Sequence, residues 1–223
     1  MPNDRQPPSR DSATPADPGA GVSRRSFIKT VGVSSAAAAL QTRNEAAGQD
    51  GATPDPVILG PGPIPVSLEV NGQAARVSVE PDTSLLDLLR LNLGLTGSKE
   101  ICGRGSCGGC SVILDGKLVC SCLTPAVDAE GARVTTVEGI ARGGELDPVQ
   151  ASFIRHDGLQ CGYCTPGFIV AARSLLDENP EPTLEEIKHG LCGNFCRCAA
   201  YTNIYNAVLD ASGQAPIRDG GDA

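Results

Sequence analysis

The sequence predicts an α+β protein in which a strand-rich part precedes a helical part. In the first part, apolar and polar residues alternate between turn residues, which is the pattern of β-hairpins. In the second part, apolar residues recur at helical spacing behind capping residues. Ten cysteines fall into two dense groups, one in each part. Each part is therefore expected to carry its own thiol-rich site.

The strand-rich part is expected over residues 64–137 and opens with a hairpin. Asn71-Gly72 separates two alternating segments and favours a two-residue hairpin turn. A helix should follow, capped by Thr83 or Asp82. Hairpin, helix, cysteine loop and further strands together predict a ferredoxin-like β-grasp domain. The expected elements are strands 65–70 and 75–79, helix 84–92 with Leu85, Leu86, Leu88 and Leu89 facing inward and Gly94 closing it, hairpin 111–120 around Asp115-Gly116, and strand 134–137.

The helical part is expected over residues 147–212. Asp147-Pro148 is a helix-start signal that Thr165-Pro166 repeats, and Thr183 to Glu186 has the form of a capping box. These signals predict a four-helix bundle with cysteine pairs at two of its connections. The expected helices run over residues 148–156, 165–177, 184–191 and 201–209, after a linker at 138–146 and before a flexible tail at 213–223.

Residues 1–47 are expected to be a disordered N-terminus that ends in an export signal. Arg24-Arg25 precedes Phe27 and a mildly apolar stretch over 31–40, which is typical of a twin-arginine (Tat) signal. The alternative is a basic turn before an alanine-rich helix. The Tat route carries folded proteins, so metal centres can be inserted before the chain reaches the periplasm. Residues 48–63 contain four prolines and should form a stiff linker.

Composition excludes several classes of protein. The formal net charge is -8, whereas nucleic-acid binding begins with a basic surface. No run of about 18 apolar residues exists, so no membrane span is expected. The sequence contains no evident nucleophile–base pair or acid–base carboxylate pair, and the two histidines, His156 and His189, are expected on helix surfaces. No catalytic residue and no substrate site are therefore expected on this chain.

The first cysteine group has the spacing of an iron–sulfur site. Cys102, Cys107 and Cys110 form C-x4-C-x2-C, by which plant-type ferredoxins hold a [2Fe–2S] cluster. Cys120 and Cys122 share a strand face, so spacing alone does not choose the fourth ligand. Glycines at 103, 105, 108 and 109 allow backbone N–H groups to approach the sulfurs, and the charge of Arg104 should favour the reduced cluster.

The second cysteine group has the form of another four-thiolate site. Cys161-x2-Cys164 is followed by Cys196-x-Cys198, and each pair lies beside an expected helix N-terminus. A structural zinc site is the alternative, although zinc pairs usually have wider spacing than C-x-C. Cys192 is expected to be a non-ligand.

Both cysteine groups, in this order, resemble the [2Fe–2S] subunit of the xanthine dehydrogenase family of molybdenum hydroxylases. With the Tat-like start, the chain is most similar to iron–sulfur subunits of periplasmic aldehyde oxidoreductases. The resemblance covers residues 64–212 and rests on three stretches: Cys102-Gly-Arg-Gly-Ser-Cys-Gly-Gly-Cys-Ser-Val-Ile-Leu-Asp-Gly116, Gln160-Cys-Gly-Tyr-Cys-Thr-Pro-Gly167 and Gly193-Asn-Phe-Cys-Arg-Cys198.

The resemblance implies a division of labour in a heterotrimer. A large partner would bind a molybdopterin cofactor, as the cytosine dinucleotide, and hydroxylate an aldehyde or N-heterocycle with water. Electrons would pass through the helical-domain cluster, then the ferredoxin-like cluster, and on to an FAD subunit or a cytochrome. It also implies Cys122 as the fourth ligand of the first site, with Cys120 a small buried residue, and pterin contacts for Gln160 and Cys198.

The chain departs from the family pattern at two places. Ala199-Ala200-Tyr201 follows the last ligand, where the family usually has Thr-Gly or Gly-Ala, and Gly103-Arg104 replaces acidic or amide residues. Neither departure removes a ligand.

Two other classes of protein remain as alternatives: a stand-alone ferredoxin-like carrier with a structural second metal site, and a disulfide-stabilised exported binding protein.

Overall fold

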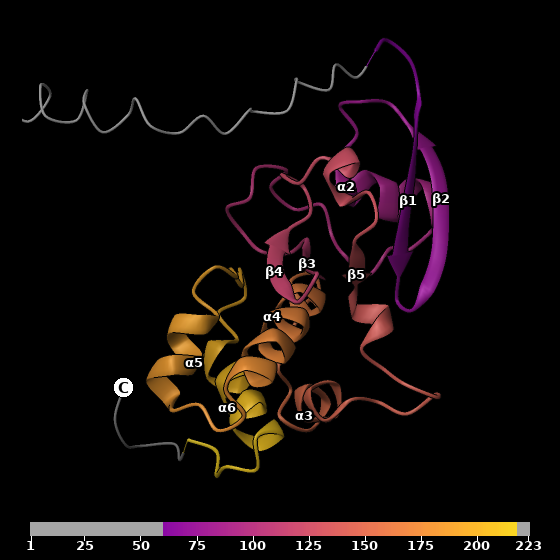
Figure 1. The fold of residues 1–223 in the computed structure, drawn as a ribbon. Coiled ribbons are helices and arrows are strands. Elements are labelled where there is room, and N and C mark those ends of the chain that lie inside the picture. The colour runs from indigo at the N-terminus through magenta and orange to yellow at the C-terminus, as the bar shows by residue number, and fades with distance from the viewer. Residues whose placement is uncertain (1–59, 218–223) are drawn as a thin grey trace, which may run out of the picture. The chain divides into compact units, whose positions relative to one another are not determined.

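A computed structural model describes residues 60–217 (Figure 1). The expected Tat segment at 1–47, most of the proline-rich linker and the end of the tail lie outside the described residues. Within residues 60–217, a five-stranded sheet is followed by a helical region, as the sequence predicts. No helix in this range is long and apolar enough to cross a membrane.

The predicted first hairpin is confirmed. Strands β1 (Ile64–Val70) and β2 (Gln73–Val79) pair antiparallel, and Val70 lies opposite Gln73. The turn residues Asn71 and Gly72 have φ angles of 53° and 79°. Two positive φ angles define the turn type whose twist matches that of the flanking strands.

The second hairpin is also confirmed, as β3 (Ser111–Leu114) and β4 (Lys117–Cys120). A short strand, β5 (Arg133–Thr135), joins the two hairpins, since it pairs parallel with β1 and antiparallel with β3. The strand order is β2-β1-β5-β3-β4. The expected last strand at 134–137 ends early, because the N–H of Thr136 donates to the side chain of Asn71 and a 3-10 turn follows at Val137–Gly139.

The predicted helix after β2 exists, but its cap and its winding differ from the prediction. Helix α2 (Leu85–Asp87) continues directly into one π-helical turn, η2 (Leu88–Asn92). The cap is Ser84, not Thr83 or Asp82, because the Ser84 hydroxyl accepts the N–H of Asp87 at 3.1 Å. The four predicted inward leucines are at most 1% exposed, and Leu85, Leu88 and Leu89 belong to the core of the sheet region.

Four helices follow, and their predicted bounds agree with the structure to within about two residues at each end. Asp147 and Thr183 both make the reciprocal hydrogen bonds of a capping box. Phe153, Phe168 and Ile204 are at most 1% exposed in the helical core. The helices are α3 (Pro148–Arg155), α4 (Thr165–Glu178), α5 (Leu184–Gly190) and α6 (Tyr201–Ala211).

Helix α4 joins the helical region to the sheet. It contacts the strands β3 and β4 and also the helices α3 and α5 (Figure 1). Its buried residues include the small side chains of Ala171 and Ala172, which permit close packing. The cysteine loops that flank β3 and α4 are thereby brought to one region of the molecule.

Asp210 ties α6 to α3. Its carboxylate accepts hydrogen bonds from the hydroxyl of Ser152 at 2.7 Å and from Nε of Arg155 at 3.0 Å, and Nε2 of His156 lies 3.4 Å away. The Ser152 hydroxyl and the Arg155 guanidinium hold the pKa of Asp210 below its usual range. The charged form of Asp210 therefore stabilises the helical region.

Asp210→Asn should lower the free energy of unfolding by about 1 kcal/mol at neutral pH, because a charge-assisted hydrogen bond is replaced by a neutral one. The folded pKa lies below the unfolded value of about 3.9, so the carboxylate's contribution is fully present above that value and is lost as the pH falls through the folded pKa. Denaturant unfolding should thus give a constant difference between variant and native protein above about pH 5, which shrinks in stronger acid. Equal stability at pH 7 would contradict the role assigned to Asp210.

Candidate iron–sulfur sites

The first candidate site is built on the loop before β3 and the turn after β4. The loop carries Cys102, Cys107 and Cys110, and the turn carries Cys122. Backbone N–H groups point at the sulfurs: Ser106 N donates to Cys102 Sγ at 3.4 Å, and Gly105 N to Cys122 Sγ at 3.3 Å. Such donors stabilise thiolates and tune the potential of an iron–sulfur cluster.

Two glycines in this loop lie against neighbouring side chains. Gly105 has a φ of +69°, and an added Cβ would lie 2.4 Å from Cδ1 of Leu123. A Cβ on Gly109 would lie 2.3 Å from Cδ1 of Ile101. Leu123 and Ile101 are themselves partly exposed, at 63% and 43%. Both side chains can move aside, so the left-handed backbone of Gly105 is the stronger reason for glycine in this loop.

The thiols of the first site fall into two pairs. The N–H of Arg104 and then the thiol of Cys107 lower the pKa of Cys102 to about 7. Burial and then the thiol of Cys110 raise the pKa of Cys122 to about 11. Cys102 thus pairs with Cys107, and Cys110 with Cys122. Two pairs of cysteine thiols are the donor set that a [2Fe–2S] cluster needs, since each iron takes two thiolates.

Cys120 is a fifth thiol beside this site. It is half-buried, and its Sγ lies 3.7 Å from the carbonyl oxygen of Gly105, to which it donates. The spacing left Cys120 and Cys122 open as the fourth ligand. The geometry favours Cys122, because Gly105 N–H points at Cys122 whereas the Cys120 thiol is engaged with a carbonyl.

The second candidate site lies at the start of α4 and in the loop before α6. Cys161 is exposed, and the N–H of Tyr163 and then the thiol of Cys198 lower its pKa. Cys164 is buried, and burial followed by the thiol of Cys196 raises its pKa to about 12. The pairs are therefore Cys161 with Cys198 and Cys164 with Cys196.

A buried hydroxyl also fits a cluster at the second site. Thr165 Oγ1, next to Cys164, is buried and has no hydrogen-bond partner among the described residues. A buried polar atom needs a partner, and a cluster sulfur beside Cys164 would supply one. Within residues 60–217, no three His, Cys, Asp or Glu side chains are grouped to hold a single metal ion. A two-iron cluster does not require three side chains around one ion, because each iron is bound by two thiolates.

The structure places the remaining sequence-predicted residues at or near the second site. Gln160 is exposed and directly precedes the exposed Cys161, while Cys198 is half-buried. Cys192 is exposed, and its N–H donates to the carbonyl of His189 at 3.2 Å at the end of α5. This bond involves only the backbone of Cys192, so its assignment as a non-ligand stays a prediction.

The contact that joins the two sites is not predicted by the sequence. Phe195 N donates to the carbonyl of Cys107 at 3.0 Å, and Asn194 Nδ2 donates to the carbonyl of Gly108 at 3.0 Å. Gly167 faces the same carbonyl, since an added Cβ would lie 2.2 Å from Gly108 O. Asn194 and Gly167 belong to the stretches that carry the family resemblance. The motifs therefore include both residues, although the spacing does not reveal that they contact the first cysteine loop.

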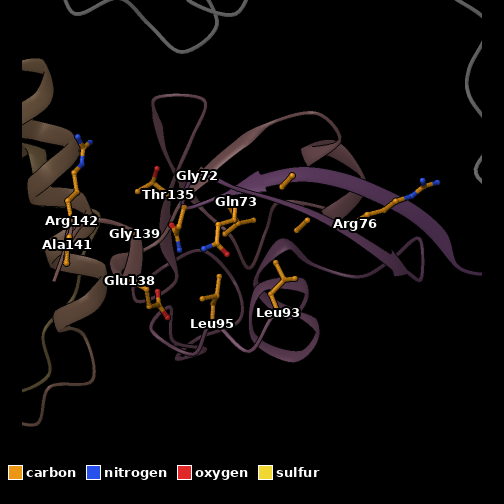
Figure 2. A pocket seen from close by; sticks show the side chains of 15 residues that line it. Gly72, Gln73, Arg76, Leu93, Leu95, Thr135, Glu138, Gly139, Ala141 and Arg142 are labelled. Atoms are coloured by element: carbon orange, nitrogen blue, oxygen red, sulfur yellow. The ribbon is translucent and has the colours of Figure 1, made fainter.

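The sheet region also carries a surface pocket (Figure 2). It is bounded by the β1–β2 turn and includes Arg76, Leu95, Glu138 and Arg142. Its lining contains no cysteine. The pocket is thus no part of either thiol site.

Two family models match consecutive parts of the described chain. Residues 68–136 match the 2Fe-2S iron-sulfur cluster binding domain, and residues 136–209 match the [2Fe-2S] binding domain. The fold and the paired thiols therefore define a two-domain iron–sulfur protein.

The chain is similar to iron–sulfur subunits of known oxidoreductases. The aldehyde oxidoreductase iron-sulfur-binding subunit PaoA of Escherichia coli strain K12 is 41% identical over 209 residues, which cover 86% of this chain and 89% of PaoA. A probable xanthine dehydrogenase subunit of Bacillus subtilis is 49% identical over 66% of this chain and 87% of its own length. A chain of quinoline 2-oxidoreductase from Pseudomonas putida 86 superposes with a TM-score of 0.64 at 42% identity, over 70% of this chain and 99% of its own.

The chain belongs to the family of iron–sulfur subunits of xanthine dehydrogenase-type molybdenum hydroxylases. The predicted resemblance is confirmed. The protein is accordingly an iron–sulfur subunit of an oxidoreductase complex.

Serine variants at the two neighbouring thiols should separate ligand from non-ligand. Cys122→Ser should lower the iron bound at the first site, because an alkoxide or hydroxyl is a poorer iron ligand than a thiolate. Cys120→Ser should retain native iron and acid-labile sulfide. Iron loss in the Cys120 variant with retention in the Cys122 variant would reverse the assignment.

Ala199 occupies a backbone conformation that suits glycine. Its φ of +59° lies in the left-handed region, where an alanine costs about 1 kcal/mol more than a glycine. Ala199→Gly should therefore raise the free energy of unfolding of the holoprotein by about 1 kcal/mol. Ala207→Gly, in the interior of α6, is the matched control and should lower stability. A decrease in stability for Ala199→Gly would show that this conformation carries no strain.

Proposed function

We propose that this protein is the electron-transfer subunit of a periplasmic, molybdenum-containing aldehyde or N-heterocycle oxidoreductase. In this proposal it relays electrons from a molybdopterin centre to an FAD subunit or a cytochrome. The proposed ligands of the first [2Fe–2S] cluster are Cys102, Cys107, Cys110 and Cys122, and those of the second are Cys161, Cys164, Cys196 and Cys198. Each bound cluster would supply a one-electron redox centre.

The observation that carries the proposal is the direct hydrogen bond between the two ligand loops. Phe195 directly precedes the proposed ligand Cys196, and its N–H donates to the carbonyl of Cys107, itself a proposed ligand of the other cluster. The route from Cys196 to Cys107 therefore runs through covalent bonds and a single hydrogen bond. A chain that only stored two separate metal ions would not need its ligand loops joined in this way.

The side chains around the second site suggest where electrons enter. Leu159, Tyr163 and Phe195 are each 40% exposed or more, and all three lie within a few residues of proposed ligands. Exposed large apolar residues beside a functional group favour burial against a partner. We assign this face to a large molybdopterin-binding subunit, with Gln160 and Cys198 in contact with the pterin, carried as its cytosine dinucleotide.

The names of two relatives support an aldehyde or an N-heterocycle as the substrate of the proposed complex. One is an aldehyde oxidoreductase subunit and another is a small subunit of nicotine 6-hydroxylase. The Tat-like segment over residues 23–47 supports export in the folded state to the periplasm. A heterotrimer with a flavin subunit is the assembly proposed. We propose residues 64–137 as the ferredoxin-like domain and residues 147–212 as a helical domain that forms a four-helix bundle.

Metal analysis of the anaerobically purified protein tests this function. About four iron and four sulfide per chain, with two distinct EPR signals after reduction by dithionite, would support two [2Fe–2S] centres. About two iron, or bound zinc, would leave a single-cluster carrier with a structural second site. Copurification of a large molybdenum-containing subunit would separate the oxidoreductase subunit from a stand-alone carrier.

Gly167→Ala should slow electron transfer between the two centres several-fold. The added Cβ would lie 2.2 Å from the carbonyl of Gly108 and must push the α4 N-terminus away from the first cysteine loop. Freeze-quench EPR after substoichiometric reduction measures how fast the two signals equilibrate.

Gly193→Ala is the matched control for this change. Gly193 lies in the loop that carries Cys196, and an added Cβ there meets no atom within 4 Å. It should equilibrate at the native rate. Equal rates for both variants would contradict a route through the joined loops.

A further inference from the structure

Cys120 makes a contact that the proposed ligand set does not use. It ends β4, where it lies opposite Ser111 in the β3–β4 ladder. Its own carbonyl accepts hydrogen bonds from Leu123 N at 3.0 Å and from Thr124 Oγ1 at 3.2 Å. The backbone of Cys120 is therefore fixed by strand and turn. Its thiol reaches back across the loop and donates to the carbonyl of Gly105 at 3.7 Å.

The carbonyl of Gly105 belongs to the same peptide group as the N–H of Ser106. That N–H donates to Cys102 Sγ at 3.4 Å. One peptide group thus accepts a hydrogen bond from the Cys120 thiol and donates one to the sulfur of a proposed ligand. Hydrogen bonds in such a chain polarise one another, so the first strengthens the second.

Gly105 makes this peptide group easy to turn. Its φ is +69°, and a glycine passes between backbone conformations at little steric cost. The neighbouring residues Arg104 and Ser106 are exposed, so packing holds the outer side of the loop weakly. Hydrogen bonds at the two ends of the peptide group are then what fix its orientation.

We propose that Cys120 is a positioning residue for the first cluster, whose thiol orients the Gly105–Ser106 peptide group so that its N–H donates to Cys102 Sγ. The inference rests on the proposed ligand set of the first site. Donation to a ligand sulfur stabilises the reduced, more negative state and raises the reduction potential. Cys120 therefore holds the potential of the first cluster at a higher value than the loop would give without it.

Redox titration of the purified holoprotein, followed by EPR, tests the proposal with two variants. Cys120→Ala removes the donor and should shift the potential of the first cluster to a more negative value. Cys120→Ser keeps a hydroxyl donor and should give a potential between those of Cys120→Ala and the native protein, or equal to the native one. The second cluster provides an internal control, and its potential should stay the same in both variants.

Four results would overturn the proposal. The first is a native potential for the first cluster in Cys120→Ala. The second is an equal shift in both variants, which would indicate lost packing in place of a lost donor. The third is loss of first-site iron in Cys120→Ala, which would make Cys120 a ligand. The fourth is a native protein without a first cluster, which would overturn the proposed function as well, whereas the other three leave the two-cluster relay intact.

Discussion

The carbonyl of Gly108 accepts hydrogen bonds from both the sheet part and the helical part, and the close approach of the two cysteine loops depends on it. It accepts hydrogen bonds from the hydroxyl and the N–H of Ser111, at 2.7 Å and 3.1 Å, and from the side-chain amide of Asn194 at 3.0 Å. Ser111 begins a strand of the sheet, whereas Asn194 lies 86 residues further along the chain than Gly108, in the helical part. A residue with a side chain at position 108 would collide with that amide. The close approach of the two cysteine loops therefore requires glycine at this position.

The regular elements serve mainly to hold loops that cannot hold themselves. Glycine-rich segments lose much conformational entropy on folding, so a loop such as 103–109 needs fixed anchors at both ends. Strand β3 begins directly after Cys110 and anchors the first cysteine loop. Helix α4 begins directly after Cys164 and anchors the loop that carries Cys161 and Cys164. The sheet and the helices are each small, and α4 joins them by contacting β3 and β4. The cysteine sites thus lie where two modest cores meet.

The two sites differ in exposure in a way that suits a relay. Each site has two buried cysteines and exposed apolar neighbours, but only the second site has an exposed cysteine, Cys161. The buried cysteines of the second site are Cys164 and Cys196, and Phe195 and Gly167, close to them in sequence, approach the first cysteine loop. Family membership makes the protein one subunit of an oxidoreductase complex. The geometry adds a reason for having both parts in one chain, since covalent continuity and the hydrogen bonds of Phe195 and Asn194 link their cysteine loops.

The sequence by itself determined whatever depends on neighbours within a few residues. The turn at Asn71-Gly72, the capping boxes at Asp147 and Thr183 and the cysteine spacings were all predictable, because turn type, helix capping and ligand spacing are local properties. Tertiary structure decided the rest. The parallel pairing of β5 with β1, the contact of Gly167 with Gly108 and the reach of Cys120 to Gly105 each depend on how distant segments pack. No periodicity or spacing encodes such contacts, because they arise only when separate elements bury a common core.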